Sequence, residues 1–337
     1  MNTNKKYSCI IFGRTNLKTT GLNAVSSVLK EFFEHSGWSV KLISDNYLKN
    51  EDIKFNKFDV IFLTGPMSVE KTAFNYLRSK TIIPIISLCL LRNGRGSDKV
   101  EAERLRGLSE ISDVYFMVWT TYFKQQLGLN NLINIPKPIK NIKLQKVKDY
   151  SFEKREGICL GHNLKLISKR FTGRSKYDDL NDIGYILKIL KKKYKDIKFY
   201  TYGPPASALP GIENYASSLL LCEEFLSKMR LFISLQSNET FYLVPIEAQG
   251  VGTPILYRQM PQSLDYYVGH SGLIISDFTD ICNYIDKIYY NKQIWSRLSQ
   301  VSIANYKNLT KQQRGLTSRL IVENFIDKIK INHKKGG

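Results

Sequence analysis

The chain has 337 residues, of which 43% are apolar and 12% aromatic, so it can bury two cores of ordinary domain size and is too apolar to be disordered. Its 50 Lys and Arg residues against 30 Asp and Glu residues give a formal charge of +20, which favours a polyanionic partner or a phosphate-bearing substrate. A lysine-rich bias with the surplus on solvated surfaces is an alternative explanation of the same charge.

The first part of the chain alternates apolar runs with amphipathic segments. The runs predict strands at 7–13, 38–44, 58–65, 82–91 and 113–119, and the amphipathic segments predict helices at 22–37, 68–80, 98–112 and 120–129. Because parallel strands are buried on both sides, they read as continuous apolar runs. The pattern therefore predicts a parallel sheet with helices on both faces.

Residues 133–157 interrupt this alternation with prolines, lysines and no periodicity, which predicts an interdomain linker. A second series then predicts strands at 157–161, 164–173, 197–203, 230–236, 253–257 and 272–276, and helices at 179–194, 216–229 and 243–252, before a mainly helical end from 280. We expect an α/β protein with a Rossmann-like domain at 1–132, the linker, a second Rossmann-like domain at 158–315, and a helix with a basic tail at 316–337. The two domains should face a central cleft, with ligands at the carboxyl ends of the strands.

The five cysteines are scattered, mostly in apolar runs, and form no CxxC pair or Cys/His ligand spacing. No apolar run reaches 18 residues, and the N-terminal apolar stretch is too short for a signal peptide. These features predict a reduced, metal-free, cytoplasmic protein.

The segment "ETFYLVPIEAQGVGTPILY" carries Glu239 in a predicted loop and Glu247 in the helix that follows. A carboxylate is a bidentate acceptor for the vicinal hydroxyls of a sugar or ribose. The alternative is that Glu239 caps the helix and Glu247 pairs with a lysine.

Three basic loops precede predicted helices. "SKRFTGRSK", with Arg174 and Lys176, suits a diphosphate. "GRTNLKTTG", which matches neither the dinucleotide fingerprint nor the P-loop, could approach a donor phosphate or the acceptor with little steric bulk. "LLRNGRGSDK" could bind the phosphates of an acceptor backbone. An ordinary solvated loop is the alternative in each case.

The two glutamates, together with the G-x-P turn in "GVGTPILY", resemble the E-x7-E signature of retaining GT-B glycosyltransferases, particularly glycosyltransferase family 4. This resemblance implies that Glu239 faces the donor sugar and that Glu247 holds the nucleotide ribose. "KRFTGRS" resembles the G-R…K motif of GT-B donor domains, which assigns the second domain to the nucleotide sugar and the first to the acceptor.

Further segments are similar, in chain order, to the T-even-type bacteriophage DNA α-glucosyltransferases: "CIIFGRTNLKTTGLNAV", "DVIFLTGP", "SVEKTAFNYLRS", "LLRNGRG" and "SGLIISD". This resemblance implies transfer of a hexose or pentose from a UDP-sugar to hydroxymethylated pyrimidines in double-stranded DNA, in the host cytoplasm. Members of that family carry a His or Asp just after the fourth strand. This chain has neither before Arg92, so the acceptor-side base stays open.

The resemblance and the loops together define the expected site. Its catalytic residues are Arg174, Lys176 and Glu239; its donor-binding residues are Arg170, Gly173, Glu247, Thr253, Gly21, Thr20 and His270; its acceptor-binding residues are Arg14, Arg92, Arg95 and Lys99. No metal ligands, required cofactor or protein partner are expected, and a divalent metal is optional.

Two other functions fit the same sequence. One is a bacterial envelope glycosyltransferase that acts on a lipid-linked or lipopolysaccharide saccharide, with its basic N-terminal domain on anionic lipid head groups. The other is a non-catalytic GT-B-like module that binds nucleic acid.

Overall fold

The computed structural model of the chain divides into two compact units: unit 1 comprises Met1–Ile139 and Thr310–Gly337, and unit 2 comprises Lys140–Leu309. The structure describes residues 7–13, 22–44, 46, 48, 53–64, 70–88, 103, 105–111, 113–118, 128–129, 131–135, 139, 151–160, 179–202, 213–215, 222–234, 243–259, 267–276, 278–314 and 316–335. The domain boundaries and the linker expected from the sequence stay a prediction.

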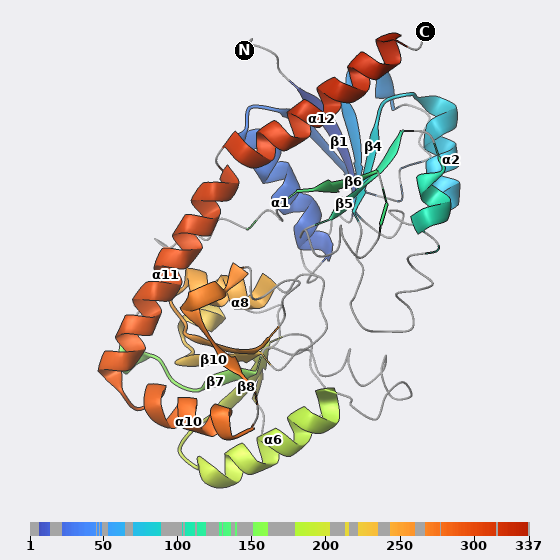
Figure 1. Cartoon of the computed structure of the whole chain (residues 1–337). Helices are drawn as coiled ribbons and strands as arrows, with labels where there is room; N and C mark the ends of the chain where they lie inside the picture. The colour runs from blue at the N-terminus through green and yellow to red at the C-terminus, as the bar shows by residue number, and fades with distance from the viewer. Residues whose placement is uncertain are drawn as a thin grey trace. The chain divides into compact units, whose positions relative to one another are not determined.

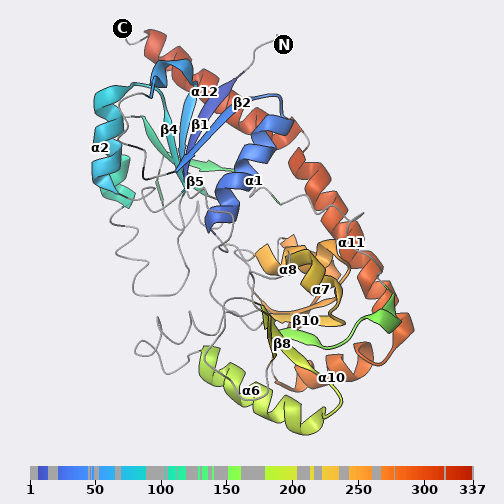
Figure 2. The same ribbon diagram turned by 180° about the vertical axis from the view of Figure 1, so that it is seen from behind.

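Unit 1 is built on a six-stranded parallel sheet with the strand order β2-β1-β3-β4-β5-β6. Its described elements are β1 (Ser8–Gly13), α1 (Leu22–His35), β2 (Ser39–Ser44), β3 (Val60–Leu63), α2 (Lys71–Lys80), β4 (Ile85–Leu88), β5 (Val114–Val118), β6 (Leu132–Asn134) and α12 (Leu316–Lys335). Helices α1 and α12 pack on one face of the sheet and α2 packs on the other (Figure 1 and Figure 2). The central strands are therefore buried on both sides.

Unit 2 holds a second six-stranded parallel sheet, with the order β12-β11-β10-β7-β8-β9. Its described elements are β7 (Ile158–Leu160), α6 (Asp179–Lys193), β8 (Phe199–Tyr202), β9 (Glu213–Tyr215), α7 (Cys222–Ser227), β10 (Leu231–Ser234), α8 (Leu243–Gly250), β11 (Ile255–Arg258), η6 (Gly269–Ser271), β12 (Gly272–Ile275), α10 (Phe278–Ile288) and α11 (Lys292–Arg314). Helices α6 and α10 cover one face of the sheet, and α7 and α8 cover the other (Figure 1). The predicted α/β class with two parallel sheets is confirmed.

Two strands have no counterpart among the predicted elements. Each of β6 and β9 has three residues and lies at the edge of its sheet. β6 reads LIN and β9 reads ENY, so neither is the continuous apolar run that the equally short β7 (ICL) is, and pairing with a neighbour sets the place of each. The predicted strand 164–173 and residues 120–127 of a predicted helix lie outside the described residues.

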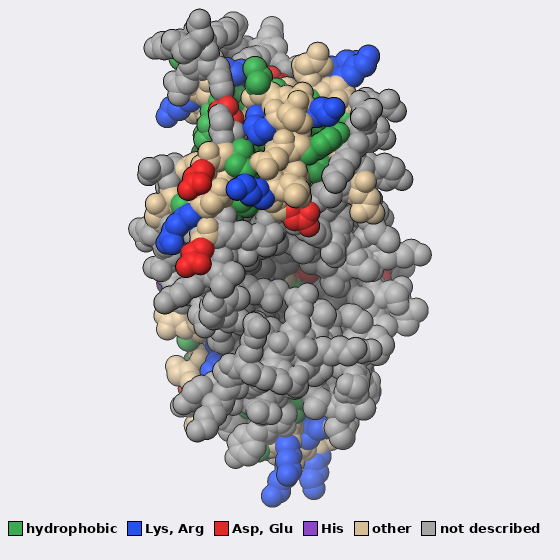
Figure 3. All heavy atoms as spheres, turned by 90° about the vertical axis from the view of Figure 1, so that its right-hand side faces the viewer, with side chains coloured by type: hydrophobic (Ala, Val, Ile, Leu, Met, Phe, Trp, Pro, Cys, Tyr) green, Lys and Arg blue, Asp and Glu red, His purple; other side chains and the backbone are tan. Residues whose placement is uncertain are grey.

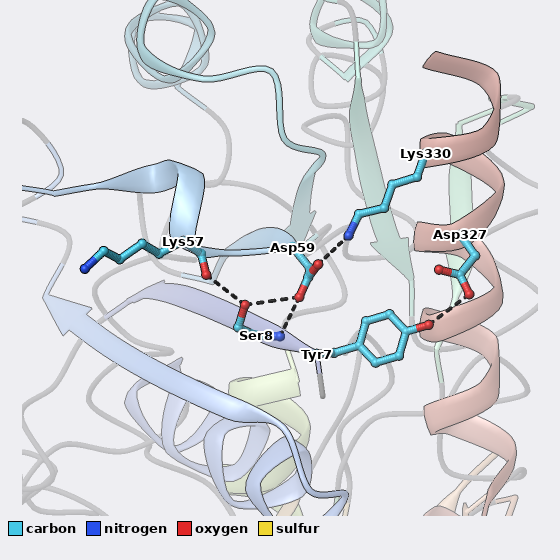
Figure 4. Close-up of polar contacts among 6 residues, drawn as sticks. All are labelled: Tyr7, Ser8, Lys57, Asp59, Asp327 and Lys330. Carbon is cyan, nitrogen blue, oxygen red and sulfur yellow. Dashed lines mark hydrogen bonds and ion pairs between the residues drawn. The ribbon is translucent and has the colours of Figure 1, made fainter. Parts of the chain in front are cut away.

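Two of the polar contacts that dock the C-terminal helix α12 lie at the amino ends of the unit 1 strands (Figure 4). Lys330 forms an ion pair with Asp59, and the same carboxylate accepts the backbone N–H of Ser8 at 2.7 Å. Nearby, the Tyr7 hydroxyl donates to Asp327 at 2.9 Å. These contacts join residues from opposite ends of the sequence.

An aromatic stack lies beneath α12. The ring centroids of Tyr7 and Trp38 are 5.1 Å apart, those of Trp38 and Phe33 are 4.7 Å apart, and those of Phe33 and Phe62 are 4.9 Å apart. The indole N–H of Trp38 donates to the buried carboxylate of Glu323 in α12 at 3.0 Å. The stacked rings therefore form an apolar surface on which α12 packs, and the Trp38–Glu323 hydrogen bond adds one buried polar contact.

Gly13 ends β1 beside Ser26 of α1 and Thr64, the residue that follows β3. A Cβ atom at this position would lie 2.2 Å from the Ser26 hydroxyl oxygen and 2.3 Å from the Thr64 hydroxyl oxygen. The two hydroxyls are buried and lie 2.8 Å apart. The close approach at the carboxyl end of β1 therefore requires glycine.

We expect Gly13→Ala to lower the free energy of unfolding by about 1–3 kcal/mol, because the added methyl group overpacks a filled site. Gly107→Ala is the matched control, since a Cβ there meets no atom within 4 Å. This control should be neutral or stabilising by about 0.5–1 kcal/mol. Denaturant unfolding followed by circular dichroism measures both, and equal stability of the two variants would contradict the packing argument.

The Asp59 anchor should make stability depend on pH. Burial favours a higher pKa for Asp59, but hydrogen bonds from Lys330 and Ser8 outweigh burial and lower the pKa below its usual value. A carboxylate with a lowered pKa stabilises the folded state above its unfolded pKa of about 3.9, and this contribution is lost as the pH falls through the folded pKa.

Asp59→Asn is therefore expected to destabilise the protein by about 1–2 kcal/mol at pH 7, after allowance for partial exposure of the pair. The difference from the unsubstituted protein should shrink below about pH 4. Glu34→Gln, which removes an exposed pair with Lys30 at 3.7 Å, should change little at either pH. Thermal melts across pH test this, and a gap that persists in acid would refute the ionic role of Asp59.

Candidate functional site

Each sheet has one place where the direction of strand succession reverses. In unit 2 this place lies between β7 and β10, and in unit 1 it lies between β1 and β3. Open α/β sheets bind their ligands outside the carboxyl ends of the strands at such a point. The chain segments that leave these ends are therefore the candidate site segments.

In unit 2 the segments predicted to bind the donor follow the two strands at the reversal point. Residues 161–178 connect β7 to α6 and include Arg170, Gly173, Arg174 and Lys176. Residues 235–242 connect β10 to α8 and include Glu239. All five lie outside the described residues, so the chain order alone relates them to this edge of the sheet.

Unit 1 has a similar order. The segment with Arg14, Thr20 and Gly21 directly follows β1, and the segment with Arg92, Arg95 and Lys99 follows β4. These six residues also lie outside the described part of the chain. Their sequence positions assign the predicted acceptor-binding cations to connections that leave the carboxyl edge of this sheet.

Glu247 is the predicted site residue that α8 positions. It is half-buried, four residues after the start of α8, which corresponds to about 6 Å along the helix axis. Because α8 follows β10, it begins at the carboxyl edge and packs back across β10 and β11. Glu247 therefore lies just past the middle of this eight-residue helix, about 6 Å from the end that begins at the carboxyl edge.

The G-V-G-T-P segment ends α8 with a Schellman motif. The N–H of Gly252 donates to the carbonyl of Gln249 and the N–H of Thr253 donates to the carbonyl of Ala248, both at 2.9 Å. Gly252 has φ +72°, the left-handed conformation that this motif needs. The predicted G-x-P turn is therefore a helix C-cap, at the amino edge of the sheet.

Thr253 has a buried hydroxyl that serves this turn. Its oxygen accepts a hydrogen bond from Arg155 at 2.8 Å and donates to the Leu226 carbonyl at 2.7 Å. The edge at which it lies is opposite the expected ligand position. Its predicted donor contact stays a prediction, and the observed contacts are structural.

His270 is exposed and lies in η6, directly before β12 and thus also at the amino edge. A buried polar cluster fixes its segment to α8 and α11. The Gln249 side-chain oxygen accepts from Ser271 at 3.0 Å and from Asn305 at 2.6 Å, and Asn305 also donates to the Tyr267 carbonyl at 3.0 Å. The structure thus joins the helix of Glu247 to the segment of His270, without placing His270 at the carboxyl edge.

Arg155 is a buried residue that no sequence pattern distinguishes. It falls in the predicted linker, where "EKREG" gives no signal that separates it from the exposed Lys154. Its guanidinium is 0% exposed, donates to the carbonyls of Val251 at 2.5 Å and Met229 at 3.3 Å, and lies 5.0 Å from the Trp295 ring centroid. A buried cation needs such acceptors and an aromatic face to offset its desolvation.

Two of the buried cysteines and the acidic and histidine side chains bear on thiol and metal chemistry. Burial raises the pKa of the Cys9 and Cys159 thiols well above the usual range, so neither is a thiolate near neutral pH. Among the residues that the structure describes, no group of three or more His, Cys, Asp or Glu side chains is placed to hold a metal ion.

Positive charge is dense at the end of α6. Six lysines lie within residues 188–198, and two of them pair with acids, Lys193 with Asp286 at 2.9 Å and Lys198 with Glu156 at 3.6 Å. Figure 3 shows Lys and Arg side chains gathered at the bottom of that view, over the part of unit 2 that carries α6. The charge surplus of the sequence is thus partly a surface feature.

The chain is similar in structure to solved glycosyltransferases. Sucrose-phosphate synthase from Thermosynechococcus elongatus aligns with 95% of this chain and 99% of its own, at a TM-score of 0.63 and 12% identity. HepE from Anabaena, solved with UDP-glucose, aligns with 94% of this chain and 99% of its own, at a TM-score of 0.62 and 11% identity. TarM aligns with 80% of this chain at a TM-score of 0.57 and 15% identity, and this chain spans only 54% of it.

Identities this low show the fold alone. The chain has the GT-B fold, with two α/β units each built on a parallel sheet. No protein-family model and no curated protein matches the sequence. Among the described helices, none is both long enough and apolar enough to cross a membrane.

Proposed function

We propose that the chain is a retaining glycosyltransferase that moves a sugar from a UDP-sugar to hydroxymethylated pyrimidines in double-stranded DNA, in the cytoplasm. One observation carries the donor half: both predicted donor segments follow strands that meet where the order of the unit 2 sheet reverses. The structures of HepE with UDP-glucose and of S. aureus TarM with UDP support a UDP-sugar as the donor.

The proposed mechanism rests on positioning and charge. Arg174, Lys176 and Arg170 would neutralise the departing diphosphate, so a divalent metal would be optional, and the small Gly173 would let the backbone approach the phosphates closely. Glu239 would orient the sugar and Glu247 would accept the ribose hydroxyls. The bond from the anomeric carbon to the phosphate oxygen breaks, the bond to the acceptor oxygen forms, and the acceptor proton passes to the leaving diphosphate.

Charge supports a polyanionic acceptor, and the resemblance of the sequence segments to DNA α-glucosyltransferases implies the hydroxymethylated bases. The net +20 and the predicted cations in the connections after β1 and β4 favour a polyphosphate backbone. Of those cations, Arg14 would follow β1, and Arg92, Arg95 and Lys99 would follow β4. A base inside a duplex must leave the stack before its hydroxymethyl group can reach a catalytic residue.

The direct test incubates the protein with several UDP-sugars and either a duplex that contains hydroxymethylated pyrimidines or an unmodified duplex of the same sequence. We expect UDP release and a nucleoside heavier by one sugar with the modified duplex alone. Mass spectrometry of the digested nucleosides measures it, and increasing salt should reduce the rate.

Two results would overturn the proposal in different ways. Transfer to a lipid-linked saccharide, with no sugar on either duplex, would keep the transferase and replace the acceptor. Binding of DNA without any UDP-sugar binding or turnover would favour the non-catalytic alternative.

Glu247→Gln should weaken UDP binding by about 10- to 100-fold, because a charged acceptor for two ribose hydroxyls becomes a neutral amide. Glu153→Gln is the matched control, since Glu153 is exposed and pairs with Lys292 at 2.5 Å at the amino edge of the sheet. Titration calorimetry with UDP measures both variants. Unchanged UDP affinity in Glu247→Gln would remove the ribose role.

A further inference from the structure

The buried guanidinium of Arg155 holds the end of α8, although it lies 96 residues before Val251 in the sequence. It donates to the Val251 carbonyl and to the Thr253 hydroxyl, which flank the left-handed Gly252. The same nitrogen that reaches Thr253 also contacts the Met229 carbonyl, just before β10. One side chain therefore fastens the C-cap of α8 to the strand that precedes this helix.

The contacts of the C-cap lead directly to Glu247. The N–H of Val251 donates to the Glu247 carbonyl at 3.3 Å, while the carbonyl of Val251 accepts from Arg155. The N–H of Thr253 donates to the Ala248 carbonyl at 2.9 Å, while its hydroxyl accepts from Arg155. Both ends of the connection are hydrogen-bonded, so displacement of the turn displaces the last turn of α8.

Electrostatics point in the same direction. The carbonyl end of a helix carries partial negative charge, and a cation at this end is favourable. Arg155 lies at the carbonyl end of α8, and Thr253 extends the contact to the Leu226 carbonyl near the end of α7. The guanidinium thus fixes the position of α8 along its own axis, relative to β10 and β11.

We propose that Arg155 and Thr253 are positioning residues for the donor site, which act through α8 on Glu247 and do not touch the substrate. This inference rests on the proposed function, because it requires Glu247 to bind the nucleotide. Binding groups act only when held within a fraction of an ångström, and a displacement of about 1 Å can cost about 100-fold. A contact at the amino edge can in this way control binding at the carboxyl edge.

The test uses Thr253→Val, which keeps the side-chain shape and removes the acceptor for Arg155. We expect its UDP dissociation constant to rise by about tenfold, which is about 1.4 kcal/mol, with a higher KM for the UDP-sugar and a smaller change in kcat. Thr253→Ser keeps the hydroxyl and should bind UDP within about twofold of the unsubstituted protein. Measurements at a temperature well below each melting transition keep unfolding out of the comparison.

Two controls separate positioning from general destabilisation. Tyr289→Phe removes the hydroxyl that accepts the Gly157 N–H at 3.0 Å, at the same edge of the sheet but away from α8, so it should lower stability and leave UDP binding unchanged. A double-mutant cycle pairs Thr253→Val with Glu247→Gln. If Thr253 acts through Glu247, the tenfold effect should fall below about twofold in the Glu247→Gln background.

The possible outcomes are distinct. Unchanged UDP affinity in Thr253→Val, or an equal loss in both backgrounds of the cycle, overturns the positioning role and leaves the proposed function intact. No UDP binding by the unsubstituted protein overturns both. A loss in Thr253→Val that is rescued in Thr253→Ser and suppressed by Glu247→Gln supports the inference.

Discussion

The organisation of unit 2 depends on the hydrogen bonds that the buried guanidinium of Arg155 donates. Removing a guanidinium from water is costly, so its acceptors must already be in place when the core closes. For Arg155 these acceptors come from Met229, Val251 and Thr253, 74 to 98 residues away. At the amino edge of this sheet, these polar groups therefore bond to one another within the unit. In unit 1, Asp59, Ser8 and Lys330 form comparable contacts at the amino edge of the sheet.

This division agrees with the proposed position of the ligands at the carboxyl edges. At one edge, side chains bond to backbone groups of the same unit; at the other, the long connections that carry Arg174 and Glu239 leave the sheet. Glu247 belongs to both regions, since its helix starts at the carboxyl edge and ends in the C-cap that Arg155 holds. Because α8 is short and joins the two edges, packing at its C-terminal end can influence binding near its N-terminal end.

The sequence was sufficient for the architecture, because buried parallel strands leave long apolar runs such as the one that contains β4. It was insufficient for β6 and β9, whose three residues are strands only by virtue of their neighbours. For the site, the residue types, their spacing and the family resemblance predict Glu247, and this stays a prediction. The sequence could not show that the Thr253 hydroxyl faces Arg155, because the two residues lie far apart in the chain. Arg155 itself has the same sequence pattern as the other charged residues of the predicted linker.

The docking of α12 sets an order for biosynthesis. Trp38, Tyr7 and Asp59 find their partners in Glu323, Asp327 and Lys330, 271 to 320 residues later. A ribosome therefore releases every residue of unit 2 before unit 1 can acquire its last helix. Until then, the aromatic side chains of Tyr7 and Trp38 are not packed against α12. The nascent chain therefore exposes an apolar surface to which a chaperone could bind.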